Sequence, residues 1–186
     1  MINIEYRDVD QEKIVVGKNV GESREKISDR GSSRSECFVE KISLFTGGGL
    51  LSVVEIIGDE VKIITDWPEE MTIESMKFTA EVLDKSRKMK RNLFLGKSWV
   101  LYVPEGSQYI LLIKVTSRRY LIPTTGLSRR ICEKLRSIPE EAYTAGELIV
   151  DTLKEVFKCN FKVTVGRYES LHEEIFVPLM ELEELT

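Results

Sequence analysis

The stretch Leu50-Leu51-Ser52-Val53-Val54-Glu55-Ile56-Ile57-Gly58-Asp59-Glu60-Val61-Lys62-Ile63-Ile64-Thr65 contains two runs that are rich in β-branched residues. Gly58-Asp59-Glu60 separates the runs, and glycine and aspartate favour a tight reversal of the chain. The pattern predicts a β-hairpin with strands over 50–57 and 61–65. It therefore favours a fold built on an antiparallel sheet.

Helical periodicity flanks this hairpin on both sides. Ahead of it, apolar residues at helical spacing predict a short helix over 36–45, which the glycines at 47–49 end. After it, an amphipathic stripe that includes Ile73 and Met76 predicts a long helix over 72–91. The basic last turns of this helix complement the negative end of its dipole.

The rest of the chain alternates between β-rich and amphipathic segments. We expect strands over 98–103, 109–115 and 120–123, helices over 125–137 and 139–158, and strands over 160–168 and 174–179. The predicted fold class is α+β. It consists of an antiparallel sheet flanked by helices, with an extra C-terminal helix and strand pair.

Four segments are expected along the chain. Residues 1–7 alternate apolar and polar side chains, residues 14–16 are a second β-prone run, and residues 1–17 would form an N-terminal β arm. Residues 18–35 are rich in Ser, Gly, Arg and Glu and would form a polar linker or loop. Residues 36–138 would form the α+β core domain. Residues 139–186 would form an appendage or a small subdomain, unless all the strands share one sheet.

Composition limits the class of protein. Of the 186 residues, 42% are hydrophobic and 31% are charged, which is typical of a globular chain, and the net charge of −4 excludes an overall basic field. No run approaches the roughly 20 apolar residues of a membrane span. No signal peptide is visible, and Cys37, Cys132 and Cys159 lack metal-binding or redox spacing. We expect a cytoplasmic protein, and scarce Gln and Asn suggest a heat-adapted source.

No catalytic motif is visible in the sequence. His172 is the only histidine, and it has no nucleophile at motif spacing. The glycines at 47–49 precede a strand and lack the following Lys of a phosphate loop. We therefore predict no enzymatic activity, no cofactor and no metal site, which leaves interaction and binding functions as the candidates.

Basic clusters are the most distinctive polar feature. One ends the long helix, and the others lie around the predicted start of the helix over 125–137. Their residues are Lys85, Lys88, Lys90, Arg91, Arg118, Arg119, Arg129 and Arg130. With nearby aromatic residues they would bind an anion or single-stranded nucleic acid if they converge in space. A mixed, solvated surface is the alternative, so nucleic-acid or phospholigand binding is the second hypothesis.

The segment Gly48-Gly49-Leu50-Leu51-Ser52-Val53-Val54-Glu55-Ile56-Ile57-Gly58-Asp59-Glu60-Val61, with Phe94-Leu95-Gly96-Lys97 through Ile113, resembles the roadblock / dynein light-chain family in element order over residues 35–137. Profilin-like, longin-like and PAS or GAF folds share much of this pattern. The resemblance implies a homodimeric scaffold that binds a small GTPase or another protein, and in which the long helices and the strands over 98–103 pair. The implied interface residues are Met76, Phe78, Val82 and Met89, with ordinary core positions as the alternative.

Overall fold

The computed structural model describes residues 37–106, 109–137 and 139–168. In chain order their elements are β2 (Val39–Thr46), β3 (Gly49–Ile57), β4 (Glu60–Asp66), α1 (Glu69–Met89), β5 (Leu93–Leu95), β6 (Trp99–Tyr102), β7 (Ile110–Val115), the 3-10 helix η1 (Arg118–Tyr120), α2 (Leu121–Lys134), α3 (Ala142–Phe157) and β8 (Lys162–Arg167). The strands form one sheet in the order β5-β6-β7-β2-β3-β4-β8. The predicted α+β class with an antiparallel sheet flanked by helices is confirmed, except that one strand pair of the sheet is parallel.

Two three-stranded meanders build the sheet. β2, β3 and β4 form the first and β5, β6 and β7 form the second, and α1 connects them. The meanders meet where β2 pairs with β7, and all these pairings are antiparallel. β8 differs because it pairs with β4 in parallel. The predicted hairpin over 50–57 and 61–65 is confirmed as β3 and β4.

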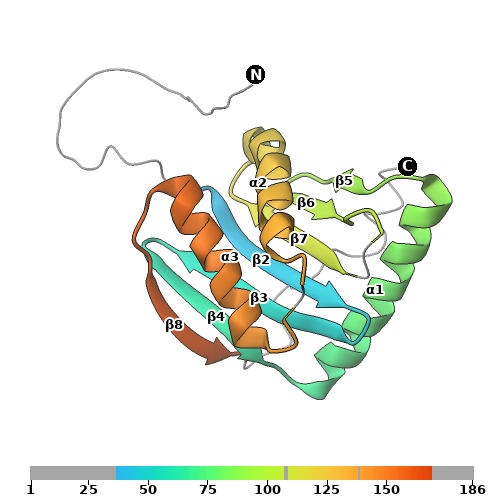
Figure 1. The fold of residues 1–186 in the computed structure, drawn as a ribbon, viewed down its shortest axis with the longest axis horizontal. Coiled ribbons are helices and arrows are strands. Elements are labelled where there is room, and N and C mark those ends of the chain that lie inside the picture. Colours follow the sequence, from blue (N-terminus) through green and yellow to red (C-terminus); the bar gives the residue numbers. More distant parts are fainter. Residues whose placement is uncertain (1–36, 107–108, 138, 169–186) are drawn as a thin grey trace. The chain divides into compact units, whose positions relative to one another are not determined.

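Side-chain alternation gives the sheet two apolar faces. In β7, Ile110 and Leu112 belong to the core cluster that contains Phe78 of α1, whereas Leu111 and Ile113 belong to the cluster beneath α2 and α3. Figure 1 shows α2 and α3 lying across the same face of the sheet. The described residues therefore form three layers, with a core on each side of the sheet.

The helix predicted over 36–45 is wrong, because this segment contains strand β2. β2 lies between β3 and β7, and Ile42, Ser43, Leu44 and Phe45 are all buried since both faces of the sheet are covered. A short apolar run that is buried on both faces lacks alternation, so helical spacing also fits it. The glycines do not end a helix. Residues 47 and 48 form the turn between β2 and β3.

The strand predicted over 120–123 is also wrong. Its residues belong to η1 and to the first turn of α2, which begins before the predicted start at 125. The Ser117 hydroxyl accepts a hydrogen bond from the Arg119 N–H (3.4 Å) at the start of η1. Pro123 is tolerated in the first turn of α2 because the N–H groups there have no partner within the helix. The β-prone run Tyr120–Ile122 is thus overridden by its helical surroundings.

Helix α3 and strand β8 follow Pro139, as expected. Ile149 and Leu153 of α3 share a core cluster with Ile63 of β4, and β8 extends the sheet beyond β4. Up to residue 167, the described strands therefore share one sheet. The expected arm at 1–17, the linker at 18–35, the strand at 174–179 and His172 lie outside the described residues.

Candidate interaction surface on helix α1

Helix α1 has charged ends of opposite sign. Glu69 and Glu70 occupy its first turn, and Arg87 and Lys88 its last. Each pair complements the local end of the helix dipole. Lys90 then ends the helix in the left-handed conformation, with its N–H bonded to the Arg87 carbonyl (3.3 Å).

The inner face of α1 packs on β2 and β3. Met71, Phe78 and Val82 are buried there. The Ser75 hydroxyl accepts a hydrogen bond from the Leu50 N–H (2.7 Å) and donates one to the Thr72 carbonyl (2.8 Å). These contacts fix which side of the helix turns outward.

The outer face carries an apolar stripe. Ile73 is 48% exposed, Met76 is 45% exposed, and Ala80 is exposed as well. Glu69 lies seven residues before Met76, and Arg87 lies seven residues after Ala80, so at about 3.6 residues per turn all five point to one side. We call Glu69, Ile73, Met76, Ala80 and Arg87 the α1 stripe. It carries Glu69 at one end, apolar side chains in the middle and, at the other end, Arg87, whose guanidinium also lies 3.8 Å from the Asp84 carboxylate.

The structure separates the four residues that the resemblance implies for an interface. Met76 belongs to the α1 stripe. Phe78 and Val82 are 2% and 1% exposed and lie in this chain's own core, and Met89 is half-buried against that core. Ile73 and Ala80 were not among the implied residues, although their helical spacing from Met76 was visible in the sequence.

Strand β6, which contains most of the implied interface strand over 98–103, has no open edge. It pairs with β5 on one side and with β7 on the other. Extension of the sheet at β6 therefore requires β5 to be displaced. The first element of the resemblance is also a strand rather than a helix.

The predicted basic residues are divided between the two sides of the sheet. One group lies at the end of α1, and the other lies in η1 and α2, which pack on the opposite face. Lys88 contacts Asp84 (3.0 Å), and the Arg119 guanidinium donates to the Tyr120 hydroxyl (2.8 Å). Their placement gives no single basic surface. The group at the end of α1 consists of Lys85, Lys88, Lys90 and Arg91. The group in η1 and α2 consists of Arg118, Arg119, Arg129 and Arg130.

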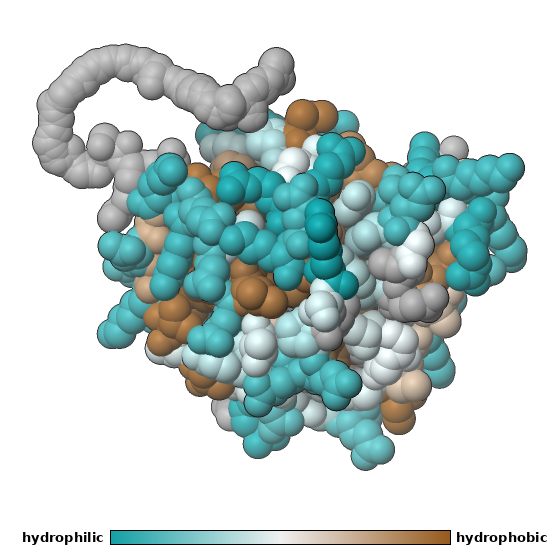
Figure 2. All heavy atoms as spheres, viewed as in Figure 1, coloured by the Kyte–Doolittle hydropathy of each residue, from teal (hydrophilic) through white to brown (hydrophobic). Residues whose placement is uncertain are grey.

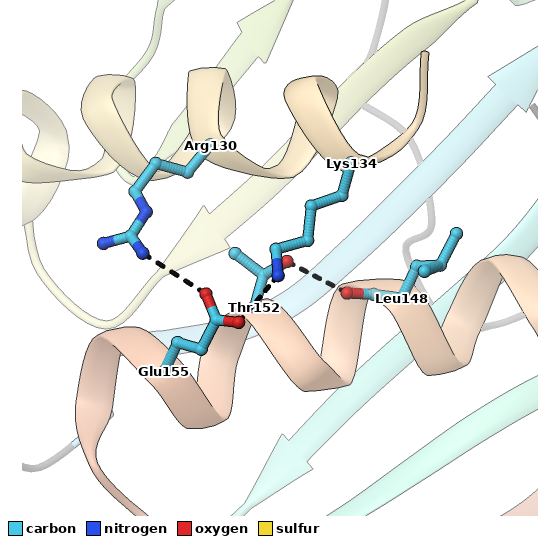
Figure 3. Close-up of polar contacts among 5 residues, drawn as sticks. All are labelled: Arg130, Lys134, Leu148, Thr152 and Glu155. Atoms are coloured by element: carbon cyan, nitrogen blue, oxygen red, sulfur yellow. Dashed lines mark hydrogen bonds and ion pairs between the residues drawn. The ribbon is translucent and has the colours of Figure 1, made fainter. Parts of the chain in front are cut away.

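Arg130 takes part in a contact between helices. Figure 3 shows Glu155 of α3 directed toward Arg130 and Lys134 of α2, at 3.3 and 2.7 Å. The hydrogen bond from Lys134 is the main reason that the pKa of Glu155 is lowered. In the same view the Thr152 hydroxyl donates to the Leu148 carbonyl within α3 (2.9 Å). Arg130 and Lys134 therefore connect α2 to α3.

Cys37 and Cys132 are suited to packing rather than to nucleophilic chemistry. Burial raises the pKa of Cys37 and of Cys132 to about 11, so both thiols are protonated at neutral pH. Burial also raises the pKa of Tyr109, whose hydroxyl donates to the Cys132 carbonyl (3.4 Å). Within the described ranges, no three His, Cys, Asp or Glu side chains are grouped to hold a metal ion. No helix in the same ranges has both the length and the apolar composition to cross a membrane.

Comparisons with protein-family models, with curated proteins and with solved structures found no match to this chain. Among the exposed side chains of the described residues, those of the α1 stripe combine apolar character with an ordered distribution of charge.

Proposed function

We propose that this protein is a non-enzymatic interaction module that forms a homodimer through the α1 stripe. The observation that carries the proposal is the order of the stripe, with exposed Ile73, Met76 and Ala80 between Glu69 and Arg87. Two copies of such a helix are complementary when they run antiparallel, because each acidic end then meets a basic end. The three free thiols favour a reducing, cytoplasmic setting.

The spacing within the stripe is self-complementary. A two-fold axis midway between Met76 and Ala80 sets Met76 of each copy opposite Ala80 of the other copy, so the same contact is made two times. Because Glu69 and Arg87 lie equally far outside this pair, the same axis sets Glu69 opposite Arg87. The small side chain of Ala80 allows the helices to approach to the usual 8–10 Å or so between axes.

The first test is the mass in solution of the full chain, 21.4 kDa per copy. We expect light scattering to give a dimer through α1 that resists salt, because its centre is apolar. Met76→Glu places a carboxylate at the centre of the pair and should raise the Kd at least about 100-fold, since burying an unpaired charge costs several kcal/mol. Ile122→Glu is the matched control, because Ile122 is 71% exposed on α2, away from α1.

A wild-type chain that stays monomeric under these conditions overturns the proposal. So does equal weakening by Met76→Glu and by Ile122→Glu, because the association would then not depend on α1. Both variants must keep the wild-type circular dichroism and melting profile. Otherwise Ala80→Glu, at the other exposed central position of the stripe, replaces Met76→Glu in the comparison.

A further inference from the structure

Strand β8 ends the sheet among the described residues, and its apolar side chains are exposed. Val163 is 38% and Val165 is 57% exposed. Figure 2 shows hydrophobic side chains at the surface on the side of the molecule where β8 lies next to α3. This strand is remote in sequence from α1.

The two valines continue apolar rows that are buried elsewhere in the sheet. Val54 pairs with Ile63, which pairs with Val165. A neighbouring row runs from Ile56 through Val61 to Val163 in the same way. In both rows the β3 and β4 members belong to the core under α3, whereas the valines of β8 are only partly covered. The apolar layer therefore extends one strand further than its cover.

The backbone of β8 has an open edge at these same residues. The N–H groups of Lys162 and Tyr168 donate to the carbonyls of Asp59 (2.9 Å) and Asp66 (3.0 Å), so even-numbered residues are bonded toward β4. Because the direction of backbone groups alternates along a strand, the N–H and C=O groups of Val163 and Val165 point away from β4. Another strand can bond to them without disturbing the sheet.

We infer that β8 pairs antiparallel with β8 of a second copy, about a two-fold axis at Thr164. Val163 then lies opposite Val165 of the other copy, and Val165 opposite Val163, as two hydrogen-bonded pairs. Thr164 lies opposite its own equivalent, and Lys162 lies opposite Gly166. The apolar rows then continue across the axis, so that each exposed valine gains an apolar neighbour on the same face.

Other registers satisfy β8 less well. If the pairing moves by one residue, N–H and C=O groups that point outward lie opposite groups that are already bonded to β4. The same shift also sets side chains of one face of the strand opposite side chains of the other face. Moving it by two residues, about an axis at Val165, sets Val163 opposite Arg167. Only the axis at Thr164 pairs both valines with valines and keeps Lys162 away from Arg167.

This contact is independent of the proposed α1 dimer, and the two are tested together. The experiment measures the mass of the full chain by sedimentation at chain concentrations from about 1 μM to about 1 mM, the range in which weak association is seen. It compares the wild type, Met76→Glu, Val165→Pro and the double variant. Proline at 165 removes an N–H that points to the open edge and leaves the bonds to β4 intact. A proline control at Ile122 is not suitable, because Ile122 lies in helix α2. The matched comparison is therefore made with lysine, between Val165→Lys and the control Ile122→Lys.

We expect Met76→Glu to form dimers through β8, Val165→Pro to form dimers through α1, and the double variant to be monomeric. The wild type should exceed a dimer at the highest concentrations, because each copy then has two self-complementary surfaces. In Met76→Glu, the amides of Val163 and Val165 should become protected from hydrogen exchange as concentration rises.

A monomeric Met76→Glu chain, with Val165→Pro still dimeric, overturns the β8 pairing and leaves the α1 proposal standing. A monomeric Val165→Pro chain, with Met76→Glu still dimeric, overturns the α1 proposal and leaves the β8 pairing standing. Protection of Val163 and Val165 that does not change with concentration also overturns the pairing, because the edge would then be covered within one chain. If Val165→Pro melts at a lower temperature than the wild type, Val165→Lys replaces it in the comparison. This variant keeps the backbone N–H and should still weaken the pairing, because it removes the apolar side chain of Val165.

Discussion

The Ser75 hydroxyl lies 2.7 Å from the backbone nitrogen of Leu50 and is the acceptor for its N–H. Ser75 is fully buried. Gly49, which precedes Leu50 in β3, leaves no room for a side chain between sheet and helix, because a Cβ there would lie 2.7 Å from the Ser75 hydroxyl. The contact joins α1 to the start of β3. It thereby helps to set the rotation of α1 and the outward direction of the α1 stripe.

Replacing Ser75 with Ala should therefore destabilise the fold. The Leu50 N–H would remain buried without its acceptor, which costs about 1–3 kcal/mol in the free energy of unfolding. Ser128→Ala is the matched control: Ser128 is equally buried, but its hydroxyl donates only to the Thr124 carbonyl of its own helix (2.9 Å). Urea denaturation measures both variants. An equal loss in the two would show that the bond to Leu50 has no special weight.

Ser52 should respond in the opposite way. Its hydroxyl is buried in β3 and has no hydrogen-bond partner among the described residues, so it bears a desolvation cost that is not offset there. Ser52→Ala should leave the free energy of unfolding unchanged or raise it by about 1 kcal/mol. The same denaturation experiment tests this. A clear loss of stability would mean that the hydroxyl has a partner in solution.

Gly146 is needed where α3 approaches the sheet. A Cβ at this position would lie 2.4 Å from the Ile63 Cγ2 atom, so Gly146→Ala should cost about 1–3 kcal/mol by overpacking. A Cβ at Gly126 in α2 would have no atom within 4 Å apart from those of its chain neighbours and of its own helix backbone. Gly126→Ala should therefore stabilise the protein by about 0.5–1 kcal/mol. Thermal melting of the two variants should therefore shift in opposite directions. A Gly146→Ala variant that melts at or above the wild-type temperature would contradict the close approach of α3.

Stability should fall at alkaline pH because of two thiols. The folded pKa of Cys37 and of Cys132 is raised from 9.0 to about 11, so the folded state holds these protons more tightly than the unfolded state. The resulting stability is fully present below about pH 9 and is lost as the pH rises through about 11. Urea midpoints at pH 8 and pH 10.5 should differ less in Cys37→Ala/Cys132→Ala than in the wild type. An identical difference would remove the thiols as its cause.

The orientation of the proposed α1 dimer can be checked by exchanging charges. Glu69→Lys alone and Arg87→Glu alone should each weaken the dimer, because each sets like charges opposite one another. Together they should restore it, with an effect of about 0.2–1 kcal/mol per pair at low salt. Sedimentation at low and high salt provides the measurement. A double variant that is weaker than either single variant would argue against antiparallel pairing.

Local sequence was enough to predict several elements. The density of β-branched residues around Gly58 and Asp59 predicted the β3–β4 hairpin, because turn chemistry and strand preference act between near neighbours in the chain. The long helix and the strands β6 and β7 were predicted for the same reason, with ends that differ by at most three residues. The stripe through Ile73 and Met76 was also visible, although nothing local showed which way it faces.

Long-range packing determined the remaining features. Val39–Thr46 is a strand because it lies between β3 and β7 and because helices from later in the chain cover both of its faces. The basic residues are separated because α1 and α2 lie on opposite sides of the sheet. The valines of β8 are exposed because the apolar layer of the sheet ends one strand beyond its helical cover. Each of these outcomes depends on contacts between residues far apart in sequence, and burial by such contacts overrides local preference.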